Sequence, residues 1–517
     1  MSPNGIAYLI GSGPGDPGLI TVKGLDCLRR ADVILYDRLI ASSLLDEAPA
    51  RAERIFVGKE SGRHIMPQHE ISALLVRLVA EGKVVARLKG GDPVLFGRGG
   101  EEAEALAEAG LPFEIVPGVT SAIGAPTYAG IPLTHRSFAS TLAIVTGHED
   151  PSKPGTRIDW RALTDIGTLV VLMGHKKLPS IVAQLLEHGR TPETPIALVQ
   201  WGTHNRQRVL VSTLSDVIEE VRRVNLGSPM VAVVGEVVNL REKLRWFDNR
   251  PLFGKRVLVT RAKEQAGTLS ALLERHGAEP VEFPVIQMVP PDDLTPLDTA
   301  MLGAARYDWV VFTSVNGVKA VIDRLYVLQK DVRVFGSSQL CAIGPATANE
   351  LGRHGLRPDL MPKEYVAESI LESIGDVAGQ HVLLPRADIA REALAVELAK
   401  RGAQVDEVVA YRTIPSGAAG DTIRAMLVQG ELDIITFTSS STVRNFMAAL
   451  EGGKTDNEPG QGSAALGPLL AGVKIACIGP ITAQTIAEYG LTVHIQAREY
   501  TIPGLVDAIL EAEKETR

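Results

Sequence analysis

Apolar residues along this chain recur with two alternating periods, one typical of strands and the other typical of helices. Short runs rich in valine, isoleucine and leucine predict buried strands. In the first hundred residues these runs cover 7–10, 33–36 and 84–88. Apolar residues spaced three and four positions apart predict helices at 22–30, 69–80 and 101–109. Because strands and helices alternate, we expect an α/β fold with largely parallel sheets.

The alternation is interrupted at 241–255. This segment, REKLRWFDNRPLFGK, is charged, lacks a clear period and contains Pro251 and Gly254. A new strand is predicted directly after it, at 256–260. A chain of 517 residues is long enough for about three or four domains. We therefore expect the main boundary here, with one domain over 1–245, a linker over 246–255 and a second domain over 256–517.

The second domain contains a repeated sequence, whose three blocks recur in the same order. VLVTRAKEQAGTLSALLERHGAEPVEF from Val257 matches VLLPRADIAREALAVELAKRGAQVDEV from Val382. YDWVVFTSVNGV from Tyr307 matches LDIITFTSSSTV from Leu432, and LCAIGPATANELGRHGL from Leu340 matches IACIGPITAQTIAEYGL from Ile475. Two copies are too few for a solenoid, so two similar lobes with a ligand cleft between them are the simpler interpretation. The glycine-rich segment 452–468 is expected to be an exposed loop.

Composition narrows the class of protein. With 45% hydrophobic and 22% charged residues, the chain has enough apolar material for several cores. A formal net charge of −8 argues against non-specific binding to nucleic acid or an anionic membrane. No apolar run is long enough for a membrane span, and the first ten residues lack the pattern of a secretion signal. The cysteines, Cys27, Cys341 and Cys477, are dispersed without zinc-site spacing, so we expect a cytoplasmic location and no metal.

Three glycine-rich loops follow predicted strands in the first half. The loop at 11–18, GSGPGDPG, is close to a dinucleotide-binding loop, but Asp16 replaces the last glycine and Pro14 removes an N–H that a phosphate would need. The others are RLKGGDPVLFGRGGEE at 87–102 and PGVTSAIGAPTYAGIPLTHR at 117–136. Gly90 and Gly91 allow a ligand to approach the backbone closely. Loops of this kind at the carboxyl ends of strands predict one binding site at that edge of a sheet.

These blocks resemble the signatures of the tetrapyrrole methyltransferase family, and within it the uroporphyrinogen III C-methyltransferases, over about residues 5–240. The resemblance implies two lobes, at about 1–115 and 120–245, which bind S-adenosylmethionine and methylate two ring carbons of uroporphyrinogen III to give precorrin-2. It implies cofactor contacts by Pro14, Gly90, Gly91, Asp92, Leu95, Thr120, Ser121, Met173 and Gly202. Ser121 replaces an alanine that is common in the family. Without the resemblance, Leu95 and Met173 would be interpreted as core residues.

The same resemblance implies roles for charged residues. Asp37 would accept a proton and Lys59 would donate one; the implied substrate contacts are Arg38, Arg98, Glu101 and Arg136. Arginine side chains suit the many carboxylates of uroporphyrinogen, and methylation of a ring carbon releases a proton that a carboxylate can accept. Simpler interpretations stay open: Asp37 as the cap of a turn, Lys59 as a surface lysine, and Arg98 with Glu101 as an ordinary ion pair.

In the second half, hydroxyl residues mark the repeated blocks. FTS occurs at 312–314 and 437–439, and IGPxTA occurs at 343–348 and 478–483, where strands end and helices begin. Helix N-termini favour anions, so these are candidate carboxylate sites, although each hydroxyl can equally be a helix cap. No nucleophile elbow, metal cluster or phosphate-binding loop occurs in this half of the sequence. This pattern suggests an enzyme that orients a reactive substrate.

The ordered set VLVTR, FTS, IGPATA, YRT, FTSSS and IGPITA resembles the uroporphyrinogen III synthases over about residues 254–510. The resemblance implies cyclisation of hydroxymethylbilane with inversion of the last ring, without a cofactor. It implies a bilobed, duplicated flavodoxin-like fold in which the first strand packs with the last third of the chain. The implied lobes are 256–284 plus 416–517 and 290–408, connected by strands at 287–291 and 408–415. Important roles are implied for Tyr411 and Thr482, and carboxylate contacts for Arg261, Ser314, Thr347, Arg386 and Ser439.

Together the two halves predict a bifunctional enzyme whose second half makes the substrate of the first, for sirohaem or cobalamin synthesis. By resemblance we expect a homodimer through the first half, with tetrapyrroles as the small-molecule partners. Three alternatives stay open. The second half can be a non-catalytic tetrapyrrole-binding module, the first half can methylate another corrinoid precursor, and Tyr411 can simply pack at the hinge.

Overall fold

The computed structural model describes residues 5–58, 66–148, 156–261, 263–362, 367–388, 393–415, 420–450 and 463–514. The chain divides into two compact units. The first contains Met1–Lys255 with Glu274–Glu279, and the second contains Arg256–Leu273 with Pro280–Arg517. Each unit contains two five-stranded sheets.

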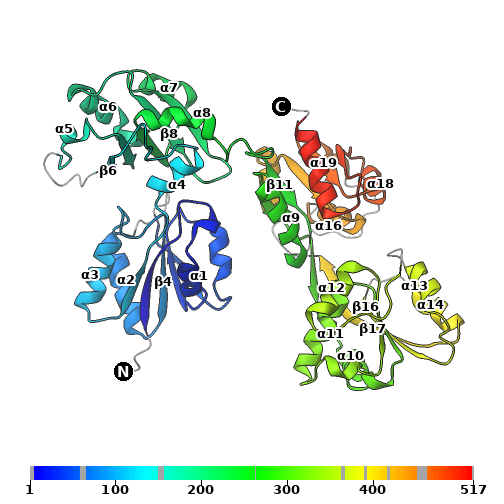
Figure 1. Cartoon of the computed structure of the whole chain (residues 1–517). Coiled ribbons are helices and arrows are strands. Elements are labelled where there is room, and N and C mark those ends of the chain that lie inside the picture. The colour runs from blue at the N-terminus through cyan, green and yellow to red at the C-terminus, as the bar shows by residue number, and fades with distance from the viewer. Residues whose placement is uncertain are drawn as a thin grey trace. The chain divides into compact units, whose positions relative to one another are not determined.

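The first sheet of the first unit is wholly parallel, with strand order β3-β2-β4-β1-β5. Its strands are β1 (Ile6–Gly11), β2 (Val33–Tyr36), β3 (Glu53–Phe56), β4 (Val84–Lys89) and β5 (Phe113–Val116). Its helices are α1 (Val22–Leu28), α2 (Gln68–Ala80) and α3 (Gly99–Glu108). Helices α2 and α3 cover one face and α1 the other (Figure 1). All five strands therefore end at the same edge of the sheet, where their following loops can meet.

Alternation along β1 explains this layering. Leu9 packs into the core under α2 and α3, whereas its neighbour Ile10 packs into the core under α1. Because both faces are covered, the strand is apolar without a polar side, as expected for a parallel sheet. The predicted strands and helices of this lobe all form. Helix α3 begins at Gly99 rather than 101, because Arg98 adopts a left-handed φ of 60° and Gly99 N donates to Pro93 O at 2.8 Å.

The second sheet of the first unit is mixed, with order β6-β7-β10-β8-β9. Only β6 and β7 pair in parallel. Its strands are β6 (Leu142–Thr146), β7 (Thr168–Leu172), β8 (Pro195–Gln200), β9 (Arg208–Thr213) and β10 (Met230–Val234). The helices after the first sheet are α4 (Ser121–Tyr128), α5 (Trp160–Leu163), α6 (Leu178–Glu187), α7 (Val217–Val224) and α8 (Arg241–Leu244). The region 241–255, predicted as a break, thus begins with a short helix.

The second unit has one sheet of order β12-β11-β18-β19-β20 and another of order β13-β17-β16-β14-β15. The first contains β11 (Arg256–Val259), β12 (Glu279–Glu282), β18 (Ile434–Phe437), β19 (Lys474–Cys477) and β20 (Ile495–Gln496). The second contains β13 (Ile286–Val289), β14 (Trp309–Phe312), β15 (Gln339–Ala342), β16 (His381–Ala387) and β17 (Gln404–Pro415). The strand order of the first sheet is the flavodoxin-like order. The predicted connecting segments pair with each other, because β13 runs antiparallel to β17 at the edge of the second sheet.

The two sequence repeats exchange their first strands. Strand β11 belongs to the first repeat, yet it pairs in parallel with β18 of the second repeat, with Val257 opposite Ile434. Strand β16 opens the second repeat, yet it pairs with β14 of the first repeat, with Trp309 opposite Val382. Each sheet therefore combines the first block of one repeat with the other two blocks of its copy. This is the crossed topology that the resemblance implied.

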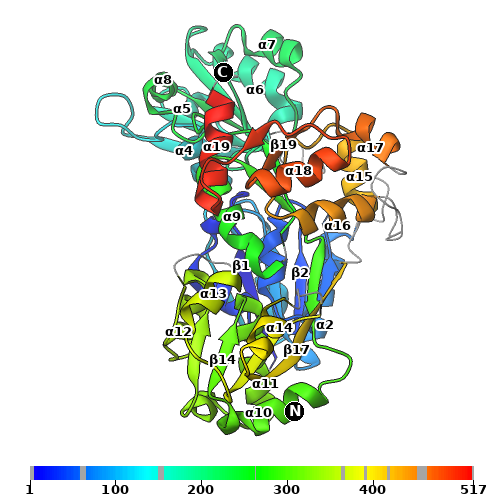
Figure 2. The same ribbon diagram turned by 90° about the vertical axis from the view of Figure 1, so that its right-hand side faces the viewer.

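Helices of the second unit flank these sheets in two groups. They are α9 (Lys263–Arg275), α10 (Thr295–Leu302), α11 (Val315–Val327), α12 (Pro345–Arg353), α13 (Ala367–Ser373), α14 (Ala393–Lys400), α15 (Gly420–Val428), α16 (Ser440–Leu450), α17 (Ser463–Leu470), α18 (Pro480–Glu488) and α19 (Ile502–Lys514). Figures 1 and 2 show α16, α18 and α19 with the sheet that contains β11, and α10 to α14 with the sheet that contains β17. Residues 463–468, expected to be part of a loop, lie in α17, and Leu470 at its end is buried against the core. Within the described ranges, every helix is too short or too polar to cross a bilayer.

An aspartate directly before a strand recurs in three of the sheets. Asp433 Oδ2 accepts a hydrogen bond at 2.8 Å from the backbone N–H of Arg256, the first residue of β11. Asp308 Oδ2 accepts one at 2.8 Å from His381, the first residue of β16, and Asp32 does the same at 3.0 Å for the first residue of β4. Each carboxylate thus satisfies a backbone donor where a strand begins and fixes its register against its neighbour.

Candidate functional site

The loops that follow β1, β4 and β5 meet at the carboxyl edge of the first sheet. Gly13 and Gly91 form an antiparallel bridge, in which Gly91 N donates to Gly13 O at 2.7 Å. A Cβ atom at Gly11 would lie 2.6 Å from Gly118 Cα, so the loops after β1 and β5 approach each other at backbone distance. Gly91 has a φ of +72°, which favours glycine. The sequence prediction that these loops share one edge is therefore confirmed.

Asp92 fixes the loop after β4 through both carboxylate oxygens. Its Oδ1 accepts from Val94 N and Leu95 N at 2.9 Å each, and its Oδ2 accepts from Gly118 N at 3.1 Å. The Asp92 carboxylate thus organises the bare backbone at Gly90 and Gly91 and ties it to the loop after β5.

The loop after β1 is held by residues of the second lobe. Asp16 accepts from the Tyr128 hydroxyl at 2.7 Å, and Asp16 N donates to Thr203 Oγ1 at 3.1 Å. Burial, followed by the hydrogen bond to Asp16, raises the pKa of Tyr128, so the phenol is a donor at neutral pH. Pro14 packs so closely on α4 that a Cβ at Gly124 would lie 2.7 Å from Pro14 Cγ. Pro14 thus determines the shape of the loop without offering an N–H.

Strained backbone gathers in the same region. Seven non-glycine residues of the described chain have positive φ, and five of them lie in loops with predicted cofactor or substrate residues. These five are Phe96, Arg98, Met173, Trp201 and Thr203. Gly202, between two of them, has no room for a side chain, since a Cβ would lie 2.3 Å from Ala125 Cβ. Strain of this kind is maintained at sites where geometry serves binding or catalysis.

The other predicted cofactor residues differ in exposure. Thr120 is 8% exposed and caps α4, where its hydroxyl accepts from Ala122 N at 3.3 Å. Ser121 begins the same helix and is half-buried. Met173 is 51% exposed, so it is not the core residue that its type suggests. Leu95 is half-buried and packs against the core under the second sheet. The glycine backbone at 90–91, with Met173 partly free to contact a ligand, fits the S-adenosylmethionine that the resemblance implies.

Asp37, the predicted proton acceptor, lies directly after β2 and belongs to a cluster of charges. Its Oδ1 accepts from Arg87 Nη2 at 2.8 Å. Arg87 Nε and Lys89 Nζ both donate to Glu102 Oε1, at 3.1 and 2.9 Å. The short helix that follows Asp37, Ser42–Glu47, has Ala41 as its N-cap, so Asp37 does not cap it. The sequence reasoning missed the three buried members, although two charges within one apolar strand, RLK, were a signal for them.

Arg98 and Glu101 form the ordinary ion pair that was one of the two interpretations. Two parallel hydrogen bonds of 2.8 and 2.7 Å join them at the start of α3. Both side chains are about half exposed, at 56% and 52%, and both border a groove between α2 and α3. The hydrogen bond from Arg98 lowers the pKa of Glu101. A substrate carboxylate would have to compete with Glu101 for the guanidinium group.

The remaining predicted residues of the first unit lie at the surface or outside the described ranges. Arg38, next to Asp37, and Arg136 are exposed, as contacts to a polyanionic substrate would require. Lys59 lies outside the described residues.

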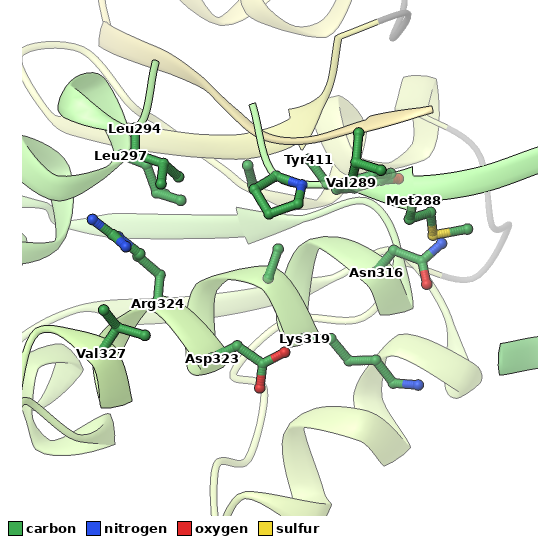
Figure 3. Close-up of a pocket in the computed structure, with 13 residues that line it drawn as sticks. Met288, Val289, Leu294, Leu297, Asn316, Lys319, Asp323, Arg324, Val327 and Tyr411 are labelled. Carbon is green, nitrogen blue, oxygen red and sulfur yellow. The ribbon is translucent and has the colours of Figure 1, made fainter. Parts of the chain in front are cut away.

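In the second unit, Tyr411 borders a cavity of about 320 Å³ (Figure 3). The cavity lies between α11, α10 and the two connecting strands, and its lining includes Met288, Val289 and Leu294. The Tyr411 ring packs against the core beneath α11, while its hydroxyl lies 3.2 Å from Ser314 Oγ. Tyr411 therefore both packs at the connecting strands, as one interpretation held, and presents a polar group.

The repeated hydroxyl residues act mainly as helix caps. Ser314 Oγ accepts from Gly317 N at 3.0 Å, and Ser439 Oγ accepts from Thr442 N at 3.3 Å. Thr347 and Thr482 lie in the first turns of α12 and α18 and are only 3% and 4% exposed. The cap interpretation thus holds for the two serines, and the threonines offer little surface to a substrate.

The two predicted arginines of this unit are partly or wholly enclosed. Arg386 is 6% exposed, and its Nη2 lies 2.7 Å from Glu407 Oε1 on the neighbouring strand. The carboxylate that Arg386 binds is therefore an internal one. Arg261 is half-buried, and burial lowers its pKa.

Metal and thiol chemistry find no support in the described part of the chain. Its His, Cys, Asp and Glu side chains form no group of three that could hold a metal ion. Burial raises the pKa of all three thiols, to about 12 for Cys341. Such thiols are protonated at neutral pH and are poor nucleophiles.

Both halves of the chain match known families. Residues 7–218 match the model of the Tetrapyrrole (Corrin/Porphyrin) Methylases, and residues 267–507 match that of Uroporphyrinogen-III synthase HemD. The Porphyrin biosynthesis protein HemD of Ruminiclostridium josui is 39% identical over 515 residues, which are 98% of either chain.

Shorter relatives match the first half alone. The S-adenosyl-L-methionine-dependent uroporphyrinogen III methyltransferase of Methanosarcina barkeri is 49% identical over 47% of this chain and 96% of its own. A crystal structure of the uroporphyrin III C-methyl transferase from Thermus thermophilus is 41% identical and covers 46% of this chain and 100% of its own, with a TM-score of 0.40.

Proposed function

The chain belongs to the tetrapyrrole methylase family in its first half and to the uroporphyrinogen-III synthase family in its second, and from this premise we propose a two-step reaction sequence. The second half cyclises hydroxymethylbilane to uroporphyrinogen III with inversion of the last ring. The first half then methylates two ring carbons of that product to give precorrin-2, an intermediate for sirohaem or cobalamin.

One observation carries the methyltransferase proposal. The backbone at Gly90 and Gly91 carries no side chains and lies close to the loop that contains Asp37, whose carboxylate is held by Arg87. S-adenosylmethionine, when bound, supplies an electrophilic methyl group. Residues 90–92, Thr120 and Ser121, in the loops at this edge, would hold it together with Met173 and Gly202, which follow strands of the second sheet.

Side chains of the protein would bind the substrate and accept the released proton. A methyl group replaces hydrogen on the macrocycle, so one proton must leave for each methyl transferred, and Asp37 would accept it. Arg38, directly after the Asp37 carboxylate, and Arg136, between α4 and β6, are exposed and would bind substrate carboxylates. The family resemblance also implies Lys59 as a proton donor, and this residue lies outside the described residues.

The synthase half would work by orientation. Ring closure requires loss of the hydroxymethyl oxygen as water, so a hydrogen-bond donor near that oxygen assists departure. Tyr411 would donate from its hydroxyl, whose position Ser314 fixes at 3.2 Å. We propose no cofactor for this half, since the reaction transfers neither electrons nor an external group.

One observation favours a different role for the second half. Arg386 is engaged with Glu407, and Thr347 and Thr482 are buried, so these three predicted contacts offer little to a substrate. A non-catalytic module that binds tetrapyrroles would have this appearance. In that case the protein would leave hydroxymethylbilane to close by itself, giving only isomer I.

A one-pot assay separates these possibilities. The full chain is incubated with hydroxymethylbilane and S-adenosylmethionine, and the products are identified by mass and by isomer. Precorrin-2 supports both activities, isomer I alone contradicts the synthase, and unmethylated uroporphyrinogen III contradicts the methyltransferase. We further propose a cytoplasmic homodimer, formed through the methyltransferase half, whose partners are these small molecules rather than nucleic acid or membrane.

Tyr411→Phe tests the synthase site. Loss of the hydroxyl should lower the rate of isomer III formation roughly 10-fold, because the departing oxygen loses a donor. Tyr326→Phe is the matched control, since Tyr326 lies in the same lobe and is 60% exposed. Equal rates of isomer III formation in the two variants would show that the Tyr411 hydroxyl does not assist the reaction.

A further inference from the structure

Glu102 lies at the centre of the charged cluster formed with Arg87, Lys89 and Asp37, and it does not itself reach the sheet edge where the loops meet. We propose that Glu102 is a positioning residue for methyl transfer, which acts through Arg87 to hold the Asp37 carboxylate in place. This inference rests on the proposed function, in which Asp37 accepts a proton.

Three donors converge on one oxygen of Glu102. Its Oε1 accepts from Arg87 Nε at 3.1 Å, from Lys89 Nζ at 2.9 Å and from Gln68 Nε2 at 3.0 Å. Arg87 also donates from Nη2 to Asp37 Oδ1 at 2.8 Å. The guanidinium group thus bridges a carboxylate on α3 and a carboxylate after β2, and its planar fork fixes their relative position.

Exposure is graded along this chain of contacts. Glu102 is 0% exposed, Arg87 2% and Lys89 3%, whereas the Asp37 side chain is 30% exposed. Two positive and two negative groups balance, and only Asp37 reaches the edge where the loops meet. The buried groups therefore present a single carboxylate to the site.

Burial and charge pairing oppose each other here. Burial raises the pKa of Glu102, but Arg87 and Lys89 outweigh this and leave it below the usual value. Burial lowers the pKa of Lys89, and Arg87 adds to that effect. Glu102 therefore stays ionised at neutral pH. Its negative charge helps to hold Arg87 between the two carboxylates.

Stability alone does not explain this buried cluster of charges. Apolar residues of similar volume often stabilise a core as well as a buried ion pair does. The second oxygen, Glu102 Oε2, is buried and has no hydrogen-bond partner among the described residues. A carboxylate that served only to stabilise α3 would use both oxygens. The arrangement instead concentrates donors on the oxygen that faces Arg87, which is the route to Asp37.

A double-mutant cycle tests the proposal with the full chain. Glu102→Gln keeps the shape but removes the charge, and it should lower the single-turnover rate of the first methylation of uroporphyrinogen III about 10-fold. The KM for uroporphyrinogen III and the affinity for S-adenosylhomocysteine should change less than about 3-fold. Glu108→Gln, an exposed change in the same helix, should leave all three values unaltered.

Asp37→Asn supplies the second arm. It should lower the rate roughly 100-fold, and adding Glu102→Gln should lower it no further, because Glu102 acts only through Asp37. Multiplicative losses would show that Glu102 contributes by another route and would overturn the proposal, as would a normal rate in Glu102→Gln.

Arg87→Lys keeps the proposal testable if Glu102→Gln does not fold. The shorter ammonium cannot bridge both carboxylates, so the same 10-fold loss of rate with unchanged KM is expected. A wild-type rate in Arg87→Lys would overturn the positioning role. A wild-type protein that does not methylate uroporphyrinogen III at all would instead refute the proposed function, and the two failures are thereby distinguished.

Discussion

Two glycines of the predicted cofactor site are constrained for different reasons. Gly91 has a φ of +72°, but a Cβ there would meet no atom closer than 3.6 Å. Gly202 has a φ outside the left-handed region, but a Cβ there would lie 2.3 Å from Ala125 Cβ. Backbone conformation therefore limits the first position and space limits the second.

Alanine substitutions should separate these two constraints. Gly91→Ala should destabilise the protein by about 1 kcal/mol through left-handed strain, and Gly202→Ala should cost more, since backbone must move. Gly100→Ala, in α3 with open space around it, should be neutral or stabilising by about 0.5 kcal/mol. Thermal unfolding measures the stability changes, and calorimetric binding of S-adenosylhomocysteine shows whether the folded variants keep the cofactor site. Equal stability of all three variants would contradict the prediction.

The Cys341 thiol should make stability depend on pH in the alkaline range. Its pKa is raised from 9.0 to about 12 by burial, so the folded state retains a proton that the unfolded state releases. The stabilisation is complete below pH 9 and is lost as pH rises toward 12, at about 1.4 kcal/mol per pH unit. Urea unfolding at pH 9 and pH 11 should show a shallower decline for Cys341→Ala than for the wild type, and parallel declines would contradict this.

Residue identities were only partly predictable from sequence. The glycine loops were found because their composition is visible locally. Glu102 and Gln68 were not, because Glu102 contacts Arg87 from 15 residues away and Gln68 contacts Glu102 from another helix. Only the packed fold brings these side chains together. Arg386 was predicted to meet a substrate carboxylate, but its partner Glu407 lies on a neighbouring strand that the motif does not reveal.

At the scale of elements, the aspartate before a strand links neighbouring strands in three sheets. It accepts a hydrogen bond from the backbone N–H of the first residue of the neighbouring strand, which would otherwise have no partner. Strands such as β1, β4 and β11 were predictable within one or two residues because their apolar runs are short and bounded. The start of α3 was not, since it depends on the left-handed turn at Arg98, and α17 was missed because its sequence, SAALGPLL, contains glycine and proline.

Removal of these aspartates should have graded effects. Asp433→Ala should destabilise the second unit by about 1 kcal/mol, because Arg256 N loses its partner in a partly buried setting. Asp308→Ala should cost less, since that bond is exposed to water. Asp507→Ala, an exposed change in α19, is the control. Denaturant unfolding monitors all three, and an equal effect of Asp507→Ala would show that loss of charge alone is responsible.

At the scale of the whole molecule, lobes and repeats in the second unit do not coincide. The repeats were visible in the sequence, but their exchange of first strands was not, because similarity between blocks does not say which blocks pair. The sheet of β13 to β17 is formed by one continuous segment, whereas the other sheet draws strands from both ends of the unit.

Two fragments of similar length should therefore behave differently. Residues 284–417 contain every strand of one sheet and should fold alone. Residues 256–380 contain one complete sequence repeat but lack β18, which pairs with β11, and β16, which pairs with β14, and they should remain unfolded. Circular dichroism and cooperative thermal unfolding compare them, and a cooperative transition in the second fragment would refute the strand exchange.

The exchange of first strands also determines when β11 can pair during synthesis. When β11 leaves the ribosome, its partner is still to be made, since the bond from Arg256 to Asp433 spans 177 residues. At about 5–20 residues per second, β11 waits roughly 10–35 s with an apolar edge unpaired. In that interval the methyltransferase and the continuous lobe can fold on either side of it. Strand β11, the first strand after the boundary between the two units, is therefore open to misassembly during synthesis.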